Sequence, residues 1–296
     1  MWGRLPDVLC HYTSLEAFKD IVKTKKFWAT SIRYFEKDPT EFKYAIDFTL
    51  ASMGEFRKDY PSDDQAFLSE FEHELNWIKQ NLEKHELYIF VCSFTGLENQ
   101  PDQYYEHCPD GNGYCICFDV QKLYSVAVQY GAKFGPCLYD EDEQRREIQK
   151  ALREGVNEYF HRELKSALSK NQDTQTSARI AANYFILIFI TKFVPFLKKG
   201  KFEKEQEWRF SYSPEVYGPG PLEGRGLRTR RGNIKPEIPY VEISLQGYWG
   251  RYGQFPFTKV YIGPTLDVDG AVKYAEEFLR KHGVYDCKVA KSGIPL

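Results

Sequence analysis

The sequence predicts an α+β fold. Roughly six to eight short β-rich runs are spread along the chain, and three or four helical segments interrupt them without a regular βαβ alternation. Of the 296 residues, 42% are hydrophobic, which is enough to bury a substantial core. Because no internal repeat is visible, we expect a single domain over residues 1–296, with a helical insertion at about 140–200.

The N-terminal elements alternate between strand and helix. Residues 8–13 form an apolar-to-aromatic run typical of a strand, and Thr13 or Ser14 can cap the helix that follows. That helix has one apolar face, formed by Leu15, Phe18, Ile21 and Val22. The pattern then predicts a strand at residues 27–31 and a second helix at about 41–53.

The remaining elements follow from the charged and apolar runs. A polar helix is expected around residues 64–84, and the continuous apolar run at 87–95 is typical of a central buried strand. Between residues 138 and 201 the pattern is helical, first charged and then apolar. Further strands are expected at 113–119, 207–212, 238–243 and 257–263, and a last amphipathic helix at about 270–282.

The most apolar stretch, residues 181–197, is nearly long enough to span a membrane. It contains Asn183, Lys192 and Pro195, which favour a buried core helix. No membrane partner is therefore expected. A membrane span remains the alternative, since lysines follow the stretch directly.

Charge and cysteine usage limit the class of protein. The 40 Lys and Arg balance 42 Asp and Glu, so no overall field attracts the chain to nucleic acid or to a membrane surface. The seven cysteines are odd in number and scattered, and no secretory pattern precedes them. We therefore expect a cytoplasmic protein without disulfides.

Several common chemistries lack their motifs. The sequence has no GxGxxG opening a helix, no GxxxxGK[ST], no HExxH and no GxSxG. Cys115 and Cys117 would share one face of a strand, with His107 and Cys108 upstream, but no CxxC pair is present. We therefore interpret these cysteines as core residues and expect no metal. A nucleophilic pair of Cys108 with His107 or His11 stays open as an alternative.

Two local patterns are candidates for a site. His11, Tyr12 and Thr13 end the first strand directly before a helix, where a histidine can bind a ribose hydroxyl and the helix N-terminus can bind an anion. The plainer interpretation is a histidine that caps the helix. In the second pattern, Glu205 and Glu207 would lie on one face of a strand, where they repel unless a ligand or cation lies between them. Such a pair can stabilise an oxocarbenium centre, and a solvated charge run is the alternative.

Together these patterns resemble, over the whole chain, a large bacterial family described as a domain of unknown function. The shared motifs are Leu-x-His-Tyr-Thr-Ser, Trp-Ala-Thr, Asp-Pro-x-Glu-Phe, Ser-Phe, Gly-x-Cys-Ile-x-Phe-Asp, Glu-x-Glu-Trp-Arg and Ile-Pro-Leu. They stand here at residues 11–14, 28–30, 38–42, 93–94, 113–119, 205–209 and 294–296. The chain departs from the family before the Gly-x-Cys strand, where it has Tyr104 and His107.

The order of these features also resembles, more remotely, the ADP-ribosyltransferase superfamily. This resemblance implies a split antiparallel sheet with peripheral helices, and NAD as the substrate. By position, His11 would bind a ribose of NAD, Thr13 would contact the ribose or pyrophosphate, and Ser93 would lie at the nicotinamide pocket. Glu207 would be the catalytic carboxylate, and Glu205 would be the first Glu of the Glu-x-Glu element.

The same resemblance extends the NAD site to neighbouring residues. Tyr12, Phe94, Tyr104 and Arg209 would complete the NAD-binding set. A ring that would stack on nicotinamide could come from Tyr34, Phe35, Phe94, Tyr104 or Tyr105, since any flat aromatic ring suits this role.

The same resemblance implies that a macromolecule, either a protein or a nucleic acid, would accept ADP-ribose. The lysines of 198–204, and Arg228, Arg230 and Arg231, flank the Glu-x-Glu element and could contact phosphates of RNA or DNA; solvated loops are the alternative. The resemblance implies a toxin or phage-defence effector, with an antitoxin or defence-system partner. Two alternatives use the same pocket: a module that binds a nucleotide without turnover, and a hydrolase of NAD or another N-glycoside.

Overall fold

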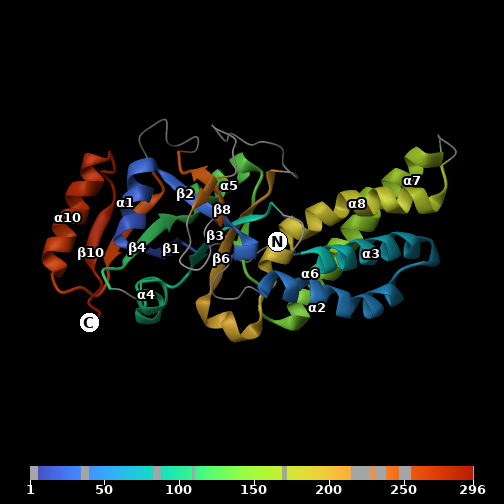
Figure 1. The fold of residues 1–296 in the computed structure, drawn as a ribbon, viewed down its shortest axis with the longest axis horizontal. Helices are drawn as coiled ribbons and strands as arrows, with labels where there is room; N and C mark the ends of the chain where they lie inside the picture. Colours follow the sequence, from blue (N-terminus) through green and yellow to red (C-terminus); the bar gives the residue numbers. More distant parts are fainter. Residues whose placement is uncertain are drawn as a thin grey trace.

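A computed structural model describes residues 6–34, 40–82, 88–108, 111–168, 172–214, 228–230, 238–246 and 255–295. It confirms the mixed α+β class. Most of the strands, with α1, α4 and α10, occupy one end of the molecule, and a group of helices projects from the other end (Figure 1).

The described part of the chain contains nine α-helices and ten strands. The helices are α1 (Leu15–Thr24), α2 (Glu41–Phe56), α3 (Gln65–Asn81), α4 (Pro101–His107), α5 (Val120–Tyr130), α6 (Glu141–Glu154), α7 (His161–Leu168), α8 (Thr174–Lys192) and α10 (Val268–Lys281). The strands are β1 (Val8–Thr13), β2 (Lys26–Ser31), β3 (Phe90–Thr95), β4 (Tyr114–Asp119), β5 (Lys133–Pro136), β6 (Glu207–Tyr212), β7 (Arg228–Arg230), β8 (Ile238–Ser244), β9 (Phe257–Ile262) and β10 (Lys288–Lys291).

Every predicted element is present, and local chemistry explains several of the boundaries. Ser14 caps α1, because its side chain accepts a hydrogen bond from the backbone N–H of Ala17. The predicted counts were nevertheless too low, since α4, α5, β5, β7 and β10 were not predicted. The short strands among them have little apolar content of their own, and pairing with a neighbouring strand holds them in place.

The sheet branches at β3. Its strand order is β10-β9-β4-β1-β3-β2-β8-β7, and β6 pairs with both β3 and β5. One edge of β3 pairs with β6 along the whole strand. The other edge pairs with β1 only at Cys10 and Thr95, and with β2 at Phe90 and Val91. All pairs between the named strands are antiparallel except β9 with β10. β1 and β2 therefore diverge along this edge of β3 and leave a split beside it.

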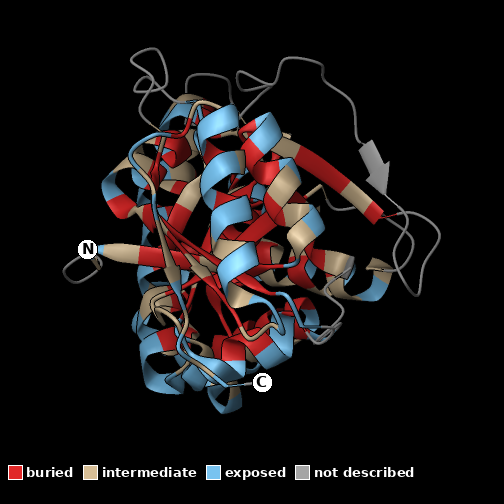
Figure 2. Ribbon diagram, turned by 90° about the vertical axis from the view of Figure 1, so that its left-hand side faces the viewer, coloured by how far each residue is buried: buried red, intermediate tan, exposed pale blue. Residues whose placement is uncertain are grey.

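Two hydrophobic cores support this arrangement. The first lies between the sheet and helices α1, α5 and α10. The second is formed largely by α2, α3, α6 and α8. The helical part is therefore larger than the predicted insertion at 140–200, because α3 packs on α8 and α2 packs on α3. Figure 2 shows that the strands are mostly buried, whereas the helices expose one face.

Helix α8 belongs to the second core. The segment Thr174–Phe196 is long and apolar enough to cross a membrane by composition alone. Its Phe185 and Phe189 are, however, fully buried, and they pack against Phe71 of α3. The prediction that this stretch packs as a core helix is confirmed.

Close backbone packing beside α4 requires a glycine at position 263. A Cβ atom on Gly263 would lie 2.6 Å from the ring of Tyr104 and 2.9 Å from the carbonyl oxygen of Gly113. We expect Gly263→Ala to lower the free energy of unfolding by about 1–3 kcal/mol, because neither group has room to move freely. Urea unfolding measures this effect.

The matched control is Gly54→Ala in α2, where the added Cβ meets nothing within 4 Å beyond its chain neighbours and the backbone of its own helix. This change is expected to leave the free energy of unfolding unchanged or to raise it by up to about 1 kcal/mol. Equal stability of Gly263→Ala and the wild type would contradict the close packing at Tyr104.

Candidate functional site

A cavity of about 210 Å³ lies where β1 diverges from β3. Its lining comes from β1, β3 and β6, from α2 and α4, and from the segment that precedes β6. Most of the residues predicted for the site line it: His11, Tyr12, Ser93, Phe94, Glu205, Glu207 and Arg209. The fold thus brings the two sequence patterns, almost 200 residues apart, to one cavity.

His11 bridges the split in the sheet. Its Nδ1–H donates a hydrogen bond to the backbone carbonyl of Ser93 at 2.9 Å, because a carbonyl oxygen can only accept. The ring lies between Phe27 and Phe94, at centroid distances of 5.9 and 6.0 Å. Burial lowers the pKa of His11 below its ordinary value of 6.5, against the smaller effect of the bond to Ser93. At neutral pH the ring is therefore neutral, and Nε2 carries the lone pair.

Of the other residues predicted around His11, Tyr12 lines the cavity, whereas Thr13 and Tyr104 lie behind its lining. The hydroxyl of Tyr12 donates to the carbonyl of Leu97 at 2.7 Å and accepts from the N–H of Gln100 at 2.9 Å. Tyr104 packs edge-on against Tyr12, at a centroid distance of 5.0 Å. Thr13 is buried and its carbonyl accepts a hydrogen bond from the thiol of Cys108. Neither Tyr104 nor Thr13 lines the cavity.

A buried charge cluster also lines the cavity. Arg209 donates to both carboxylate oxygens of Glu207, at 2.8 Å from Nε and 2.9 Å from Nη2. The ammonium of Lys198 lies 2.5 Å from Oε2 of Glu207 and 2.5 Å from Oε2 of Glu205. Arg209 also donates to Glu41. Three carboxylates and two cations leave one excess negative charge at the cavity.

The two carboxylates predicted for the site differ in their electrostatics. Burial raises the pKa of Glu207, but the nearby charges of Arg209 and Lys198 outweigh burial and lower it to about 2. Burial raises the pKa of Glu205, and the ion pair with Lys198 only partly opposes this. Glu207 is therefore firmly ionised, whereas Glu205 is the more easily protonated carboxylate.

The structure corrects the predicted position of Glu205. Glu205 does not lie on the strand with Glu207; it ends the 3-10 helix Gly200–Glu205, and Gln206 turns the chain in the left-handed region at φ 43°. The repulsion expected between the two carboxylates is relieved by Lys198, whose side chain is only 7% exposed. The prediction that Lys198 contacts nucleic-acid phosphates is therefore wrong.

Other predicted contacts are placed only in part. Arg228 and Arg230 lie on β7, but their side chains are outside the described part of the structure, as is Arg231. Among the aromatic candidates, Phe94 lines the cavity and Tyr105 is 58% exposed on α4. Phe35 and the side chain of Tyr34 are not described.

The sequence patterns missed several lining residues: Cys10, Glu41, Thr95, Gln103, His107, Lys198 and Phe202. Glu41 had a signal, because it stands within the Asp-Pro-x-Glu-Phe motif. Lys198 had none, since a lysine beside three others in a polar run normally faces solvent.

Residues 103–210 match the family model described as "Protein of unknown function (DUF2971)". The match covers β4 and the Glu-x-Glu-Trp-Arg motif, and it confirms the resemblance to a domain-of-unknown-function family for that stretch. A search of curated proteins and a search of solved structures found no match.

Proposed function

We propose that the cavity binds NAD and that the protein transfers ADP-ribose from NAD to a macromolecule. The observation that carries the proposal is the convergence of His11 and the Glu205–Glu207 pair on one cavity at the split in the sheet. The two patterns lie almost 200 residues apart in the chain, and packing alone does not require a neutral histidine and two carboxylates to line one cavity. Such a pair suits a ligand with a ribose and a developing positive charge.

The reaction breaks the bond between C1′ of the ribose and the nicotinamide nitrogen, and the bonding electron pair leaves with nicotinamide. The acceptor then donates an electron pair to C1′ and loses a proton. In this proposal, Nε2 of His11 accepts a hydrogen bond from a ribose hydroxyl, and Phe94 provides an apolar surface for the leaving ring. A carboxylate beside C1′ stabilises the oxocarbenium-like transition state.

The contacts favour Glu205, ahead of Glu207, as that carboxylate. Three donors already occupy the oxygens of Glu207, and its side chain is only 9% exposed. The side chain of Glu205 is 20% exposed, and no described residue hydrogen-bonds its Oε1. Glu207 then acts as a positioning residue that holds Lys198 and Arg209.

Nicotinamide release tests this function directly. Purified protein is incubated with NAD, alone and with added RNA, DNA or protein extract, and the melting temperature is measured with and without NAD. We expect NAD to raise the melting temperature, and one extract fraction to stimulate release. His11→Ala should abolish both effects, whereas His73→Ala, an exposed histidine of α3, should keep both.

The other outcomes separate the alternatives. If free ADP-ribose formed without any added extract, the protein would hydrolyse NAD and would not be a transferase. NAD binding without release would select a nucleotide-binding module, and the absence of both binding and release would exclude NAD. If Glu205→Gln inhibited growth on expression as strongly as the wild type, the protein would not act as an enzymatic toxin.

The ionisation of His11 predicts a pH dependence. Because the pKa of the folded-state ring lies below 6.5, the ring stays neutral above that pH and gains a proton only at lower pH. Protonation turns Nε2 from an acceptor into a donor. We expect NAD affinity, measured by calorimetry, to be constant above pH 6.5 and to weaken below it. A decline that begins above pH 6.5 would contradict a buried, neutral His11.

A further inference from the structure

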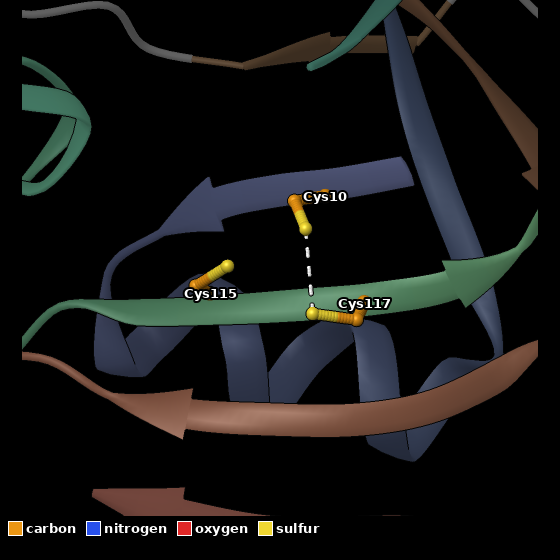
Figure 3. Close-up of side chains that lie close together, drawn as sticks. All are labelled: Cys10, Cys115 and Cys117. Atoms are coloured by element: carbon orange, nitrogen blue, oxygen red, sulfur yellow. Dashed lines mark hydrogen bonds between the residues drawn. The ribbon is translucent and has the colours of Figure 1, made fainter. Parts of the chain in front are cut away.

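Three cysteine thiols meet on one face of the sheet, next to the cavity but outside the charge cluster. Cys10 lies on β1, and Cys115 and Cys117 lie on β4 (Figure 3). The three Sγ atoms all lie within 4.8 Å of one another. The sequence pattern had grouped Cys115 and Cys117 with His107 and Cys108, but the fold brings Cys10 to them, from a strand 105 residues earlier than Cys115.

The strand register fixes this geometry. Cys10 and Cys117 are direct partners across the antiparallel pair of β1 and β4, and their sulfur atoms are 3.3 Å apart. Cys115 follows on the same face of β4, because side chains two residues apart point the same way. All three cysteines are fully buried, and together with Tyr12 and Tyr104 they form a cluster separate from the two main cores.

We propose that Cys10, Cys115 and Cys117 form a three-thiolate site for Cu(I). Thiolates select soft ions, chiefly Cu(I), Zn(II) and iron–sulfur clusters. Structural Zn(II) sites need four protein ligands, and no fourth His, Cys, Asp or Glu of the described residues joins these three. Cu(I) is a soft monovalent ion that is satisfied by three sulfur ligands in a plane.

The sulfur positions require little rearrangement to hold such an ion. A metal–sulfur distance of about 2.3 Å places three trigonal sulfur atoms about 4 Å apart. The three Sγ atoms already lie within 4.8 Å, and only the 3.3 Å pair of Cys10 and Cys117 has to widen. Rotation of the Cys10 side chain toward the cavity, which this residue lines, also gives the ion a route to the site.

An ion pair of Lys259 with Glu98 lies beside the thiols. Binding releases the thiol protons to solvent, and the bound Cu(I) itself supplies a positive charge among the buried thiolates. Lys259 of β9 is the register partner of Cys117, so the two side chains lie on the same face of the sheet. Its ammonium contacts the hydroxyl of Tyr261 at 2.7 Å and Glu98 at 3.1 Å.

Anaerobic titration of the reduced, full-length protein with Cu(I), in competition with the chelator bathocuproine disulfonate, tests the site. We expect one Cu(I) per chain, with a sulfur-only, three-coordinate shell in X-ray absorption. Cys115→Ser and Cys117→Ser should each bind Cu(I) at least about 100-fold more weakly, since even the loss of an outer-shell partner costs 10–100-fold. Cys287→Ser, a half-buried thiol outside the cluster, should bind like the wild type.

Three results would overturn the proposal. They are no Cu(I) binding by the wild type, binding that neither serine variant at Cys115 or Cys117 weakens, and Zn(II) binding as tight as that of Cu(I). The melting temperature of each metal-free variant is measured in parallel, and either of the two serine variants is sufficient if the other does not fold. Nicotinamide release plays no part in this test, so the two proposals fail independently.

Discussion

Glu207→Gln is expected to lower the free energy of unfolding by about 3 kcal/mol, as measured by urea unfolding. The Glu207 carboxylate accepts hydrogen bonds from Arg209, whose side chain is only 1% exposed, and from Lys198. Removing one partner of a buried ion pair typically costs 3–5 kcal/mol, because the remaining charge stays buried. Glutamine keeps the shape but turns an NH₂ group toward these donors, and Glu41 still partners Arg209.

The matched control is Glu203→Gln. Glu203 is exposed on the 3-10 helix next to Glu205, so its replacement should change the free energy of unfolding by less than about 0.5 kcal/mol. Equal stability of the two variants would show that Glu207 is not the centre of the buried charge cluster.

The same cluster predicts how stability depends on acid. The pKa of Glu207 falls from 4.5 to about 2 on folding, so the ionised carboxylate stabilises the folded state fully above pH 4.5. That contribution, about 3 kcal/mol, is lost as the pH falls from 4.5 toward 2. Glu207→Gln should therefore lose less stability than the wild type over this range, and parallel acid profiles would contradict the assignment.

Glu205→Gln is expected to lower the rate of nicotinamide release by at least about 100-fold, which is the usual effect of removing one group that stabilises developing charge. Its effect on stability should be small, below about 1 kcal/mol. The reason is that burial already raises the pKa of Glu205, and Lys198 keeps its contacts with Glu207 and Glu41. Single-turnover kinetics with NAD and urea unfolding of the same protein measure the two effects.

A large loss of activity with little loss of stability in Glu205→Gln distinguishes a reacting carboxylate from a positioning residue. Glu203→Gln should release nicotinamide like the wild type. A Glu205→Gln variant that keeps its activity, beside a stably folded but inactive Glu207→Gln variant, would return the catalytic role to Glu207.

Much of the fold could be predicted because its signals are local. The apolar-to-aromatic run of β1, the apolar face of α1 and the continuous apolar run of β3 depend on neighbours within a few residues. Helix α5 was missed although Asp119 caps its first turn and Gly131 ends it in the left-handed region, so a usable signal was present. Strand β10 gave almost none, because pairing with β9 is what makes it a strand.

The candidate site, like the fold, could be predicted only in part. The sequence by itself determined the candidate residues: the His11 motif and the Glu205–Glu207 element could be named from residue types and spacing. Tertiary structure decided which carboxylate is available, because Lys198 is folded inward from a lysine-rich run and Arg209 occupies both oxygens of Glu207. It also decided that Cys10 joins the two cysteines of β4. Sheet register and burial bring together residues that are far apart in the chain. A local sequence pattern cannot predict which of these distant residues will meet.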